Sequence, residues 1–144
     1  MSEEAIWDHT EEWHKLGVDF QVVVKRWSLP KSHWNLREGC QRWNVYAYIY
    51  PKHRLWDSFE GTYMFQPAAS AIPLHCGPTL LKYNIENGEV ASVQVGSDYW
   101  HLGDERFTNY ETREAAREVF RDAEELFKYL STNPEDTNLE KEKQ

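Results

Sequence analysis

Long apolar runs are missing from this sequence of 144 residues. No stretch approaches the roughly 20 apolar residues that a transmembrane helix needs, and the N-terminus lacks the basic-then-apolar layout of a secretory signal. Cysteine is scarce as well, because Cys40 and Cys76 are the only two and cannot build a disulfide framework. These absences predict a soluble cytoplasmic protein with no membrane partner.

An excess of basic charge is also absent, since 16 basic residues face 24 acidic ones and the formal net charge is −8. Most of the acidic excess lies at the ends: residues 1–12 sum to −5 and residues 131–144 to −2, which leaves −1 for residues 13–130. A near-neutral body without a Lys/Arg stripe argues against direct nucleic-acid binding. The lack of a dense acidic face on that body argues against a mimic of nucleic acid.

Aromatic residues, in contrast, are abundant and make up 15% of the chain, with seven Trp. Alternating or β-branched stretches predict strands over residues 19–27, 42–50, 79–85 and 89–97. The last two strands are expected to form a hairpin, because the Asn-Gly pair between them is the strongest short signal for a tight turn.

Helical periodicity occurs in two places. Apolar residues fall on one side of residues 112–130 and charges on the other, which predicts a long amphipathic helix. Residues 2–16 predict a short helix that Ser2 caps and Gly17 ends. The expected fold class is α+β: an antiparallel sheet of four to six strands, with the long C-terminal helix on one face and a short N-terminal helix.

The chain is expected to form a single domain over residues 1–130, followed by a disordered acidic tail over residues 131–144. On the strand 42–50, the face opposite the apolar one carries tyrosines rather than charges. This pattern predicts that both faces are covered, and we expect a second copy of the chain to cover the tyrosine face of a homodimer.

The most distinctive stretch is GSDYWHLGDE, residues 96–105, between the hairpin and the long helix. It places four acid–base or ligand groups, Asp98, His101, Asp104 and Glu105, within eight residues. The spacing Asp-x-x-His-x-x-Asp can bring two carboxylates and an imidazole to one side of a turn.

A second group, His75 and Cys76, precedes the first strand of the hairpin. Because a hairpin brings its outer ends together, we expect these residues to lie close to Asp98 and His101. Cys76 beside a histidine is compatible with a nucleophile, but a buried cysteine is more often an inert small hydrophobe.

Three interpretations of these residues stay open. A metal site would use His75, Asp98, His101 and Asp104, because mixed imidazole and carboxylate ligands suit Zn, Mn or Fe, although the spacing matches no sharp metal motif. A ligand-binding site would add Trp100, since carboxylates accept hydrogen bonds from sugar hydroxyls and aromatic rings stack on bases. In the structural interpretation, the aspartates cap turns and the histidines satisfy backbone groups.

Three blocks of the sequence resemble a family of small proteins carried by phages and mobile elements. The blocks are RWNVY through YPKHRL, LHCGPT, and GSD through HLGD. The family has W-x-x-Y-x-x-x-P-x-x-H-P-L-Y/F, H-G-G-L-T-Y/F and G-F-D-C-A-H-x-G-D in the same order, followed by a helix. The resemblance covers residues 42–130, and the matching positions include His75, Gly77, Thr79, Asp98, His101, Gly103 and Asp104.

The departures from the family pattern also carry information. Cys76 stands where the family has Gly and Tyr99 where it has Cys, so the resemblance implies no thiol mechanism; Arg54 replaces a Pro. The resemblance brings no established activity with it. It completes the expected set of ligand-binding residues, which is His75, Thr79, Asp98, Trp100, His101 and Asp104.

By analogy with accessory factors of phages, the resemblance implies a counter-defence binding protein in the cytoplasm of the host cell. Such a protein would sequester a nucleotide-like immune signal or inhibit a host defence protein, with no catalytic residue and no cofactor. Its pocket is expected to be lined by Trp100 and by Trp56 or Tyr46. The alternative is a small metal-dependent hydrolase, in which Glu105 acts as general base on water bound to a divalent metal.

Overall fold

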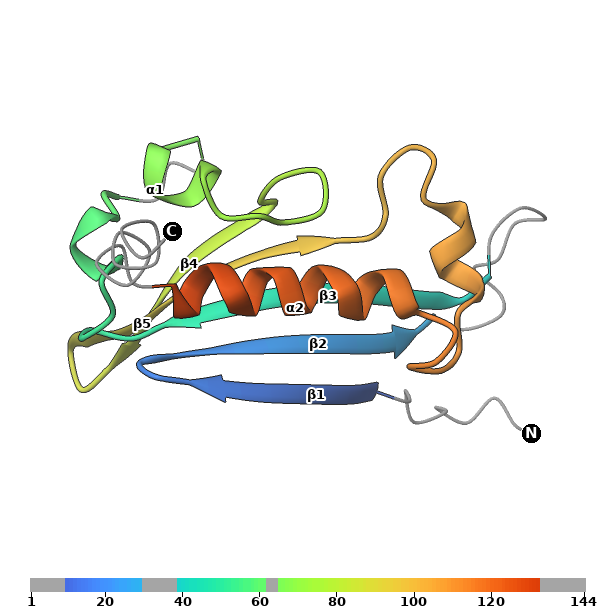
Figure 1. Cartoon of the computed structure of the whole chain (residues 1–144), viewed down its shortest axis with the longest axis horizontal. Coiled ribbons are helices and arrows are strands. Elements are labelled where there is room, and N and C mark those ends of the chain that lie inside the picture. Colours follow the sequence, from blue (N-terminus) through green and yellow to red (C-terminus); the bar gives the residue numbers. More distant parts are fainter. Residues whose placement is uncertain (1–9, 30–38, 62–64, 133–144) are drawn as a thin grey trace, which may run out of the picture.

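The computed structural model describes residues 10–29, 39–61 and 65–132, and Figure 1 shows their arrangement. Within these residues, five antiparallel strands form one open sheet in the order β1-β2-β3-β5-β4. The strands are β1 (Thr10–Gly17), β2 (Phe20–Ser28), β3 (Gln41–Ile49), β4 (Leu80–Glu86) and β5 (Glu89–Asp98). The predicted α+β class, with an antiparallel sheet and a C-terminal helix, is confirmed.

The C-terminal helix, α2 (Arg117–Ser131), lies across one face of this sheet (Figure 1). Strand β3 directs one set of alternate side chains toward it, and these bury against the apolar side of the helix. The helix begins at Arg117, later than the predicted residue 112, because Thr112 instead holds a turn by accepting the Ala115 N–H at 3.1 Å. The buried residues of this layer include Trp43, Val45, Ala47, Ile49, Val119, Ala123, Leu126 and Leu130.

The predicted N-terminal helix is wrong where the structure describes it. Residues 10–17 form strand β1, which pairs with β2 from Thr10↔Trp27 to Gly17↔Phe20 across a two-residue turn. Asp19 takes a φ of +63° in that turn, a conformation that aspartate tolerates better than most residues. Strand pairing of this stretch overrides its local helical spacing, and residues 2–9 of the predicted helix lie outside the described residues.

The predicted hairpin is present, with β4 and β5 paired from Leu80↔Gly96 to Glu86↔Glu89. Asn87 and Gly88 form its turn with φ values of +52° and +80°. These left-handed values explain the Asn-Gly signal, since both residue types adopt them at low cost.

In the parts of the connections that the structure describes, there are three short helical segments. They are η2 (Trp56–Ser58), α1 (Pro67–Ser70) and η3 (Glu105–Asn109). Residues 67–79, which are rich in proline and small residues, form a loop that starts with α1 as one helical turn. The predicted acidic tail lies, from residue 133 onward, outside the described residues. Among the residues that the structure describes, no helix is long and apolar enough to cross a membrane.

The end of α2 is held by the segment that follows β3. His53 is buried, and its Nε2 donates to the carbonyl of Leu130 at 2.8 Å while its Nδ1 accepts the Leu55 N–H at 3.1 Å. Arg54 donates to the carbonyls of Tyr129 and Thr132. Both side chains thus satisfy carbonyls that a helix end leaves without partners.

Acidification is expected to weaken this anchor. Burial lowers the pKa of His53 below its ordinary value of 6.5, although the hydrogen bond to Leu130 opposes the shift. The unfolded chain therefore binds the proton more readily, so the stabilising effect of His53 is present above pH 6.5 and is lost as the pH falls through the lower folded-state value. Urea midpoints measured at about pH 7.5 and about pH 5.5 should fall more for the wild type than for His53→Gln. An equal fall in both proteins would contradict the assignment.

Candidate functional site

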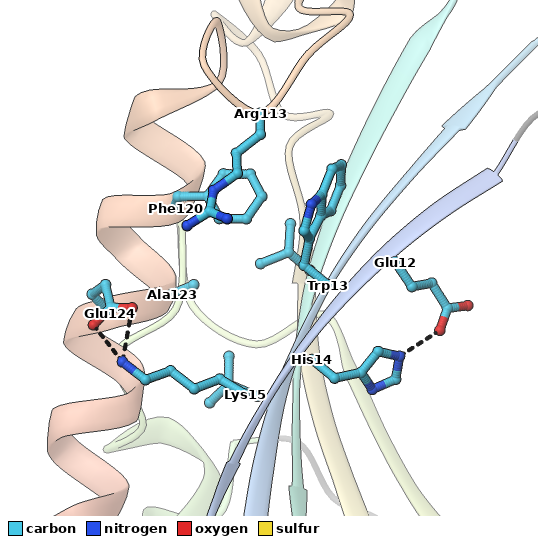
Figure 2. Close-up of a pocket in the computed structure, with 10 residues that line it drawn as sticks. Glu12, Trp13, His14, Lys15, Arg113, Phe120, Ala123 and Glu124 are labelled. Atoms are coloured by element: carbon cyan, nitrogen blue, oxygen red, sulfur yellow. Dashed lines mark hydrogen bonds and ion pairs between the residues drawn. The ribbon is translucent and has the colours of Figure 1, made fainter.

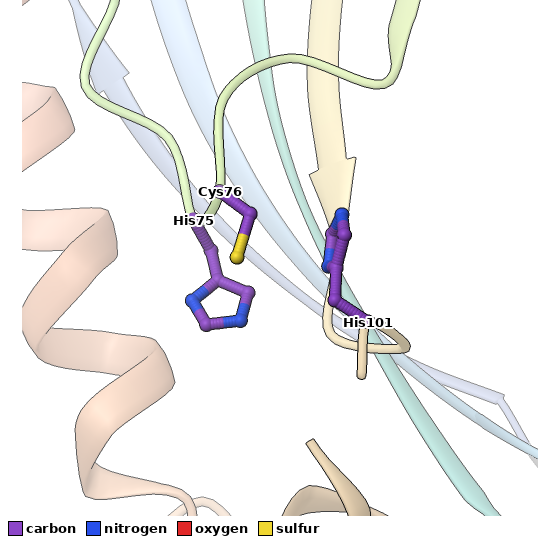
Figure 3. A group of neighbouring side chains, drawn as sticks. All are labelled: His75, Cys76 and His101. Atoms are coloured by element: carbon purple, nitrogen blue, oxygen red, sulfur yellow. The ribbon is translucent and has the colours of Figure 1, made fainter. Parts of the chain in front are cut away.

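The loop before β4 and the loop after β5 leave the same end of the hairpin (Figure 3). At the point where the two loops leave the hairpin, the backbone N–H of Thr79 donates a hydrogen bond of 2.8 Å to the carbonyl of Gly96. The hairpin therefore brings together two groups of polar residues that are more than twenty positions apart in the sequence.

The backbone of the first loop reverses direction at two left-handed residues. Cys76 has a φ of +58° and Gly77 a φ of +82°, values that glycine adopts freely and cysteine rarely. Figure 3 shows the result: the side chains of His75 and Cys76 both lie toward the loop that carries His101.

The carboxylate of Asp104 joins the two histidines. Nε2 of His75 lies 2.9 Å from its Oδ2 and 3.0 Å from its Oδ1, and Nδ1 of His101 lies 3.3 Å from Oδ2. The backbone N–H of His101 donates to the same Oδ2 at 2.8 Å. Asp104 is only 5% exposed, so three of the residues predicted for the site form one largely enclosed hydrogen-bonded group.

The charge of Asp104 determines which nitrogen of the His75 and His101 rings carries a hydrogen. Burial alone would raise the pKa of Asp104, but the hydrogen bonds from the His101 backbone N–H and from both rings lower it overall. The ionised carboxylate can only accept hydrogen bonds. Each neutral histidine is therefore protonated on the nitrogen that faces Asp104, and its opposite nitrogen keeps a lone pair.

Aromatic packing fixes the plane of the His75 ring. It stacks on Tyr99 with a centroid distance of 4.2 Å and an interplanar angle of 12°, and it meets Phe107 edge-on at 5.6 Å. Tyr99 is itself buried and donates its hydroxyl hydrogen to Asp122 at 2.6 Å. Burial and this hydrogen bond raise the pKa of Tyr99, so its phenol stays neutral and rigidly placed.

Asp98 adjoins this group in a more open position. Its Oδ1 accepts the Trp100 N–H at 3.0 Å and lies 3.6 Å from Nδ1 of His101, and its Oδ2 lies 3.5 Å from the hydroxyl of Thr79. The contact with Trp100 is a turn cap, as the structural interpretation expects. The side chain of Asp98 is 41% exposed, which leaves it accessible to a ligand.

A cavity of about 350 Å³ lies beside Asp98, where ends of β2, β3 and β5 meet. The guanidinium of Arg42 lies 3.7 Å from the ring centroid of Trp100 in a cation–π contact, and Trp100 stays 46% exposed. Neither Trp56 nor Tyr46 lines this cavity. The lining residues are Trp27, Leu29, Arg42, Trp43, Asn44, Asp98, Tyr99 and Trp100.

Of these lining residues, only Asp98 and Trp100 were among the predicted site residues, and Trp27 and Arg42 are two of the six that were not. They are direct partners across β2 and β3, and Arg42 lies two positions along β3 from Asn44, which pairs with Asp98 of β5. Only the strand register shows that Trp27 and Arg42 lie beside Asp98, and the sequence pattern alone does not fix that register. Glu105, expected as a general base, is exposed in the first turn of η3.

A second cavity, of about 500 Å³, lies between β1 and α2 (Figure 2). Trp13, Phe120 and Ala123 supply its apolar part, and an ion pair of 2.9 Å between Lys15 and Glu124 spans it. None of the residues predicted for the site line it, so it is a cleft between helix and edge strand, separate from the histidine group.

Comparisons of the chain with protein-family models, with curated proteins and with solved structures found no match.

Proposed function

We propose that the protein binds a nucleotide-like ligand in the cavity beside Asp98. The observation that carries this proposal is the combination of flat aromatic and polar groups there: Trp27 and Trp100 line the same cavity as Asn44 and Asp98. Tryptophan stacks on nucleobases, and a carboxylate accepts hydrogen bonds from ribose hydroxyls or base amino groups. A volume of about 350 Å³ is at the lower end of the range for small-molecule pockets, about 300–1,000 Å³, and suits one nucleoside unit.

The neighbouring polar groups would extend this site. Thr79 and His101 adjoin Asp98, and the rings of His75 and His101 both contact Asp104. A hydroxyl group can donate to a phosphate oxygen, and an imidazole nitrogen that keeps its lone pair can accept from a hydroxyl or amino group of the ligand. The ligand would thus place its base against Trp100 and its polar end toward the histidines.

The wider role that we propose is counter-defence by a protein of a phage or mobile element, acting in the cytoplasm of the host cell. The resemblance of three sequence blocks to phage-borne proteins supports this role, and the site chemistry supports a nucleotide-like immune signal as the ligand. In a second version of the same role, exposed Trp100 would anchor the chain on a host defence protein, since tryptophan is a frequent anchor of interfaces.

Thermal-shift and calorimetric titrations with cyclic oligonucleotides and ADP-ribose derivatives test this function. A ligand at a hundred times its Kd stabilises the folded state by about 2.7 kcal/mol, which corresponds to a rise in melting temperature of about 5–10 °C for a chain of this size. Trp100→Ala should weaken binding at least about tenfold through the loss of base stacking.

Leu102→Ala is the matched control, because Leu102 lies in the same loop and is fully exposed. It should leave the affinity unchanged. The proposal fails if no nucleotide of the panel shifts the melting temperature and host lysate yields no partner.

We also propose that the protein is a homodimer. Tyr46 and Tyr48 lie on the sheet face opposite α2, with ring centroids 6.4 Å apart, and both are half-buried. A two-fold contact of this face would bury aromatic surface on both copies. Light scattering should then give twice the chain mass of 17.1 kDa, and a mass near that of one chain would overturn this assembly.

The alternative function is a metal-dependent hydrolase with His75, Asp98, His101 and Asp104 as ligands and Glu105 as general base. Asp104 is already engaged by both histidine rings and a backbone N–H. Those contacts suit a carboxylate that orients the rings better than one that binds a metal directly. We therefore place hydrolysis second to ligand binding.

A further inference from the structure

Two polar side chains lie next to each other in the cavity beside Asp98. Asn44 of β3 is the direct cross-strand partner of Asp98 of β5, and both residues line the cavity. Partners of this kind project from the same face of a sheet, with Cβ atoms about 4.5–5.5 Å apart. A flat ligand in this cavity therefore meets both side chains together.

The orientation of the Asn44 amide is fixed by Trp27. The indole N–H of Trp27 donates to Oδ1 of Asn44 at 2.8 Å. Because an indole N–H can only donate, the atom that faces it must be the amide oxygen, and the NH2 group is directed elsewhere. Among the residues that the structure describes, that NH2 group has no hydrogen-bond partner. Asn44 thus has a donor available to a ligand.

Asp98 supplies acceptors beside this donor. Its Oδ1 accepts the backbone N–H of Trp100 at 3.0 Å, and its Oδ2 lies 3.5 Å from the hydroxyl of Thr79. The two oxygens of a carboxylate together have about four lone-pair sites, so both can accept further hydrogen bonds. With 41% of its side chain exposed, Asp98 presents two neighbouring acceptors to a ligand.

Two acceptors beside one donor distinguish the nucleobases by their hydrogen-bonding edges. Guanine has two adjacent donors, N1–H and the N2 amino group, next to the acceptor O6. Adenine and cytosine have a ring-nitrogen lone pair next to their amino group, and uracil has a carbonyl on each side of its single N–H. In these three bases an acceptor would face the second carboxylate oxygen, and this repulsion lowers their affinity.

We propose that the cavity is selective for guanine. The carboxylate of Asp98 accepts from N1–H and from the N2 amino group, and the amide of Asn44 donates to O6. This inference rests on the proposed nucleotide binding and narrows it, since guanine-containing cyclic oligonucleotides should bind more tightly than ADP-ribose derivatives, whose base is adenine. Stacking on Trp100 accepts every base, so the selectivity comes from the two polar side chains.

Calorimetric titration of the full-length chain with guanosine, inosine and adenosine monophosphates (GMP, IMP and AMP) tests this selectivity. IMP is the matched probe, because its base differs from guanine only in lacking the N2 amino group. GMP should bind at least about tenfold more tightly than IMP, which loses one hydrogen bond to a charged acceptor. AMP should bind at least as weakly as IMP, because its N1 lone pair faces the carboxylate.

Asp98→Asn is expected to change the preferred base. The new amide keeps an oxygen for the Trp100 N–H and carries an NH2 group in place of the second carboxylate oxygen. It should bind xanthosine monophosphate, whose base has a carbonyl in place of the N2 amino group, at least about tenfold more tightly than GMP. Asp57→Asn removes the same charge from an exposed residue that does not line the cavity. This matched control should keep the wild-type preference.

Equal affinities of the wild type for GMP, IMP and AMP would overturn the guanine selectivity and leave nucleotide binding standing. Binding of ADP-ribose derivatives alone, or a preference for GMP that Asp98→Asn retains, would overturn it in the same way. If neither the monophosphates nor the cyclic oligonucleotides and ADP-ribose derivatives bind, the proposed nucleotide binding fails and the selectivity fails with it.

Discussion

Replacing Trp43 with alanine is expected to lower the free energy of unfolding by about 3–5 kcal/mol, the largest effect of any single change to this core. Trp43 is 1% exposed. Its ring stacks on Trp13 at 5.7 Å and meets Phe120 edge-on at 5.9 Å. Its indole N–H donates to the carbonyl of Tyr110 at 3.1 Å, so the substitution removes both a large apolar volume and a buried hydrogen bond.

Urea denaturation followed by circular dichroism measures this loss, and Trp100→Ala is the matched control. Trp100 is 46% exposed and contacts Arg42 at the surface, so we expect its removal to cost less than about 1 kcal/mol. Comparable losses for both variants would show that the core is not centred on the layer between β3 and α2.

Asp104→Ala is expected to destabilise the fold by about 2–4 kcal/mol, whereas Asp98→Ala should cost less than about 1 kcal/mol. The first change leaves three donors without their acceptor: the ring N–H groups of His75 and His101 and the backbone N–H of His101. The second removes a cap from a half-exposed turn. The same denaturation measurement separates the two carboxylates by role.

The effect of Asp104 also has a defined pH dependence. Its folded-state pKa is lowered from 3.8, so its contribution to stability is fully present above that value and is lost as the pH falls through the lower folded-state pKa. The difference between wild type and Asp104→Ala should therefore be constant near neutral pH and shrink in acid. A large loss for Asp98→Ala at neutral pH would instead assign both aspartates to the structural framework.

Local patterns in the sequence were sufficient to predict the elements that are determined by a single local signal. The Asn87-Gly88 turn fixes the β4–β5 hairpin, and that hairpin alone brings the loop of His75 to the loop of His101. The amphipathic spacing of α2 likewise needs no tertiary information. Both signals depend only on neighbouring residues, so the hairpin and the helix can be predicted without knowledge of the rest of the chain.

Tertiary pairing decided the features that the sequence did not reveal. Residues 10–17 have helical spacing of a few apolar side chains, yet they complete the sheet as an edge strand beside β2. His53 looks like part of a basic turn, but it is buried against the end of α2 because its ring satisfies the Leu130 carbonyl. The place of Arg42 in the cavity depends on the register of β2 and β3, which only the assembled sheet sets.

The strand order β1-β2-β3-β5-β4 divides the sheet into two units, each built of strands that are consecutive in the sequence. Strands β1 to β3 follow one another directly and share the Trp13–Trp43–Phe120 contacts with α2. The β4–β5 hairpin joins them only after the long connection from β3 has closed, at an entropic cost that grows with the length of that connection. We expect sub-global opening, in which the hairpin detaches while the first unit stays folded, to require less free energy than global unfolding.

The candidate site lies across the boundary between those two units. His75, Cys76 and His101 flank the hairpin, whereas Trp27 and Arg42 belong to β2 and β3. A ligand in the cavity would contact both units at once and oppose their separation. Amide hydrogens of β4 would then exchange more slowly in the bound protein, while those of β2 would keep their protection. Slower exchange in β4 would thus report that a bound ligand couples the two units of the sheet.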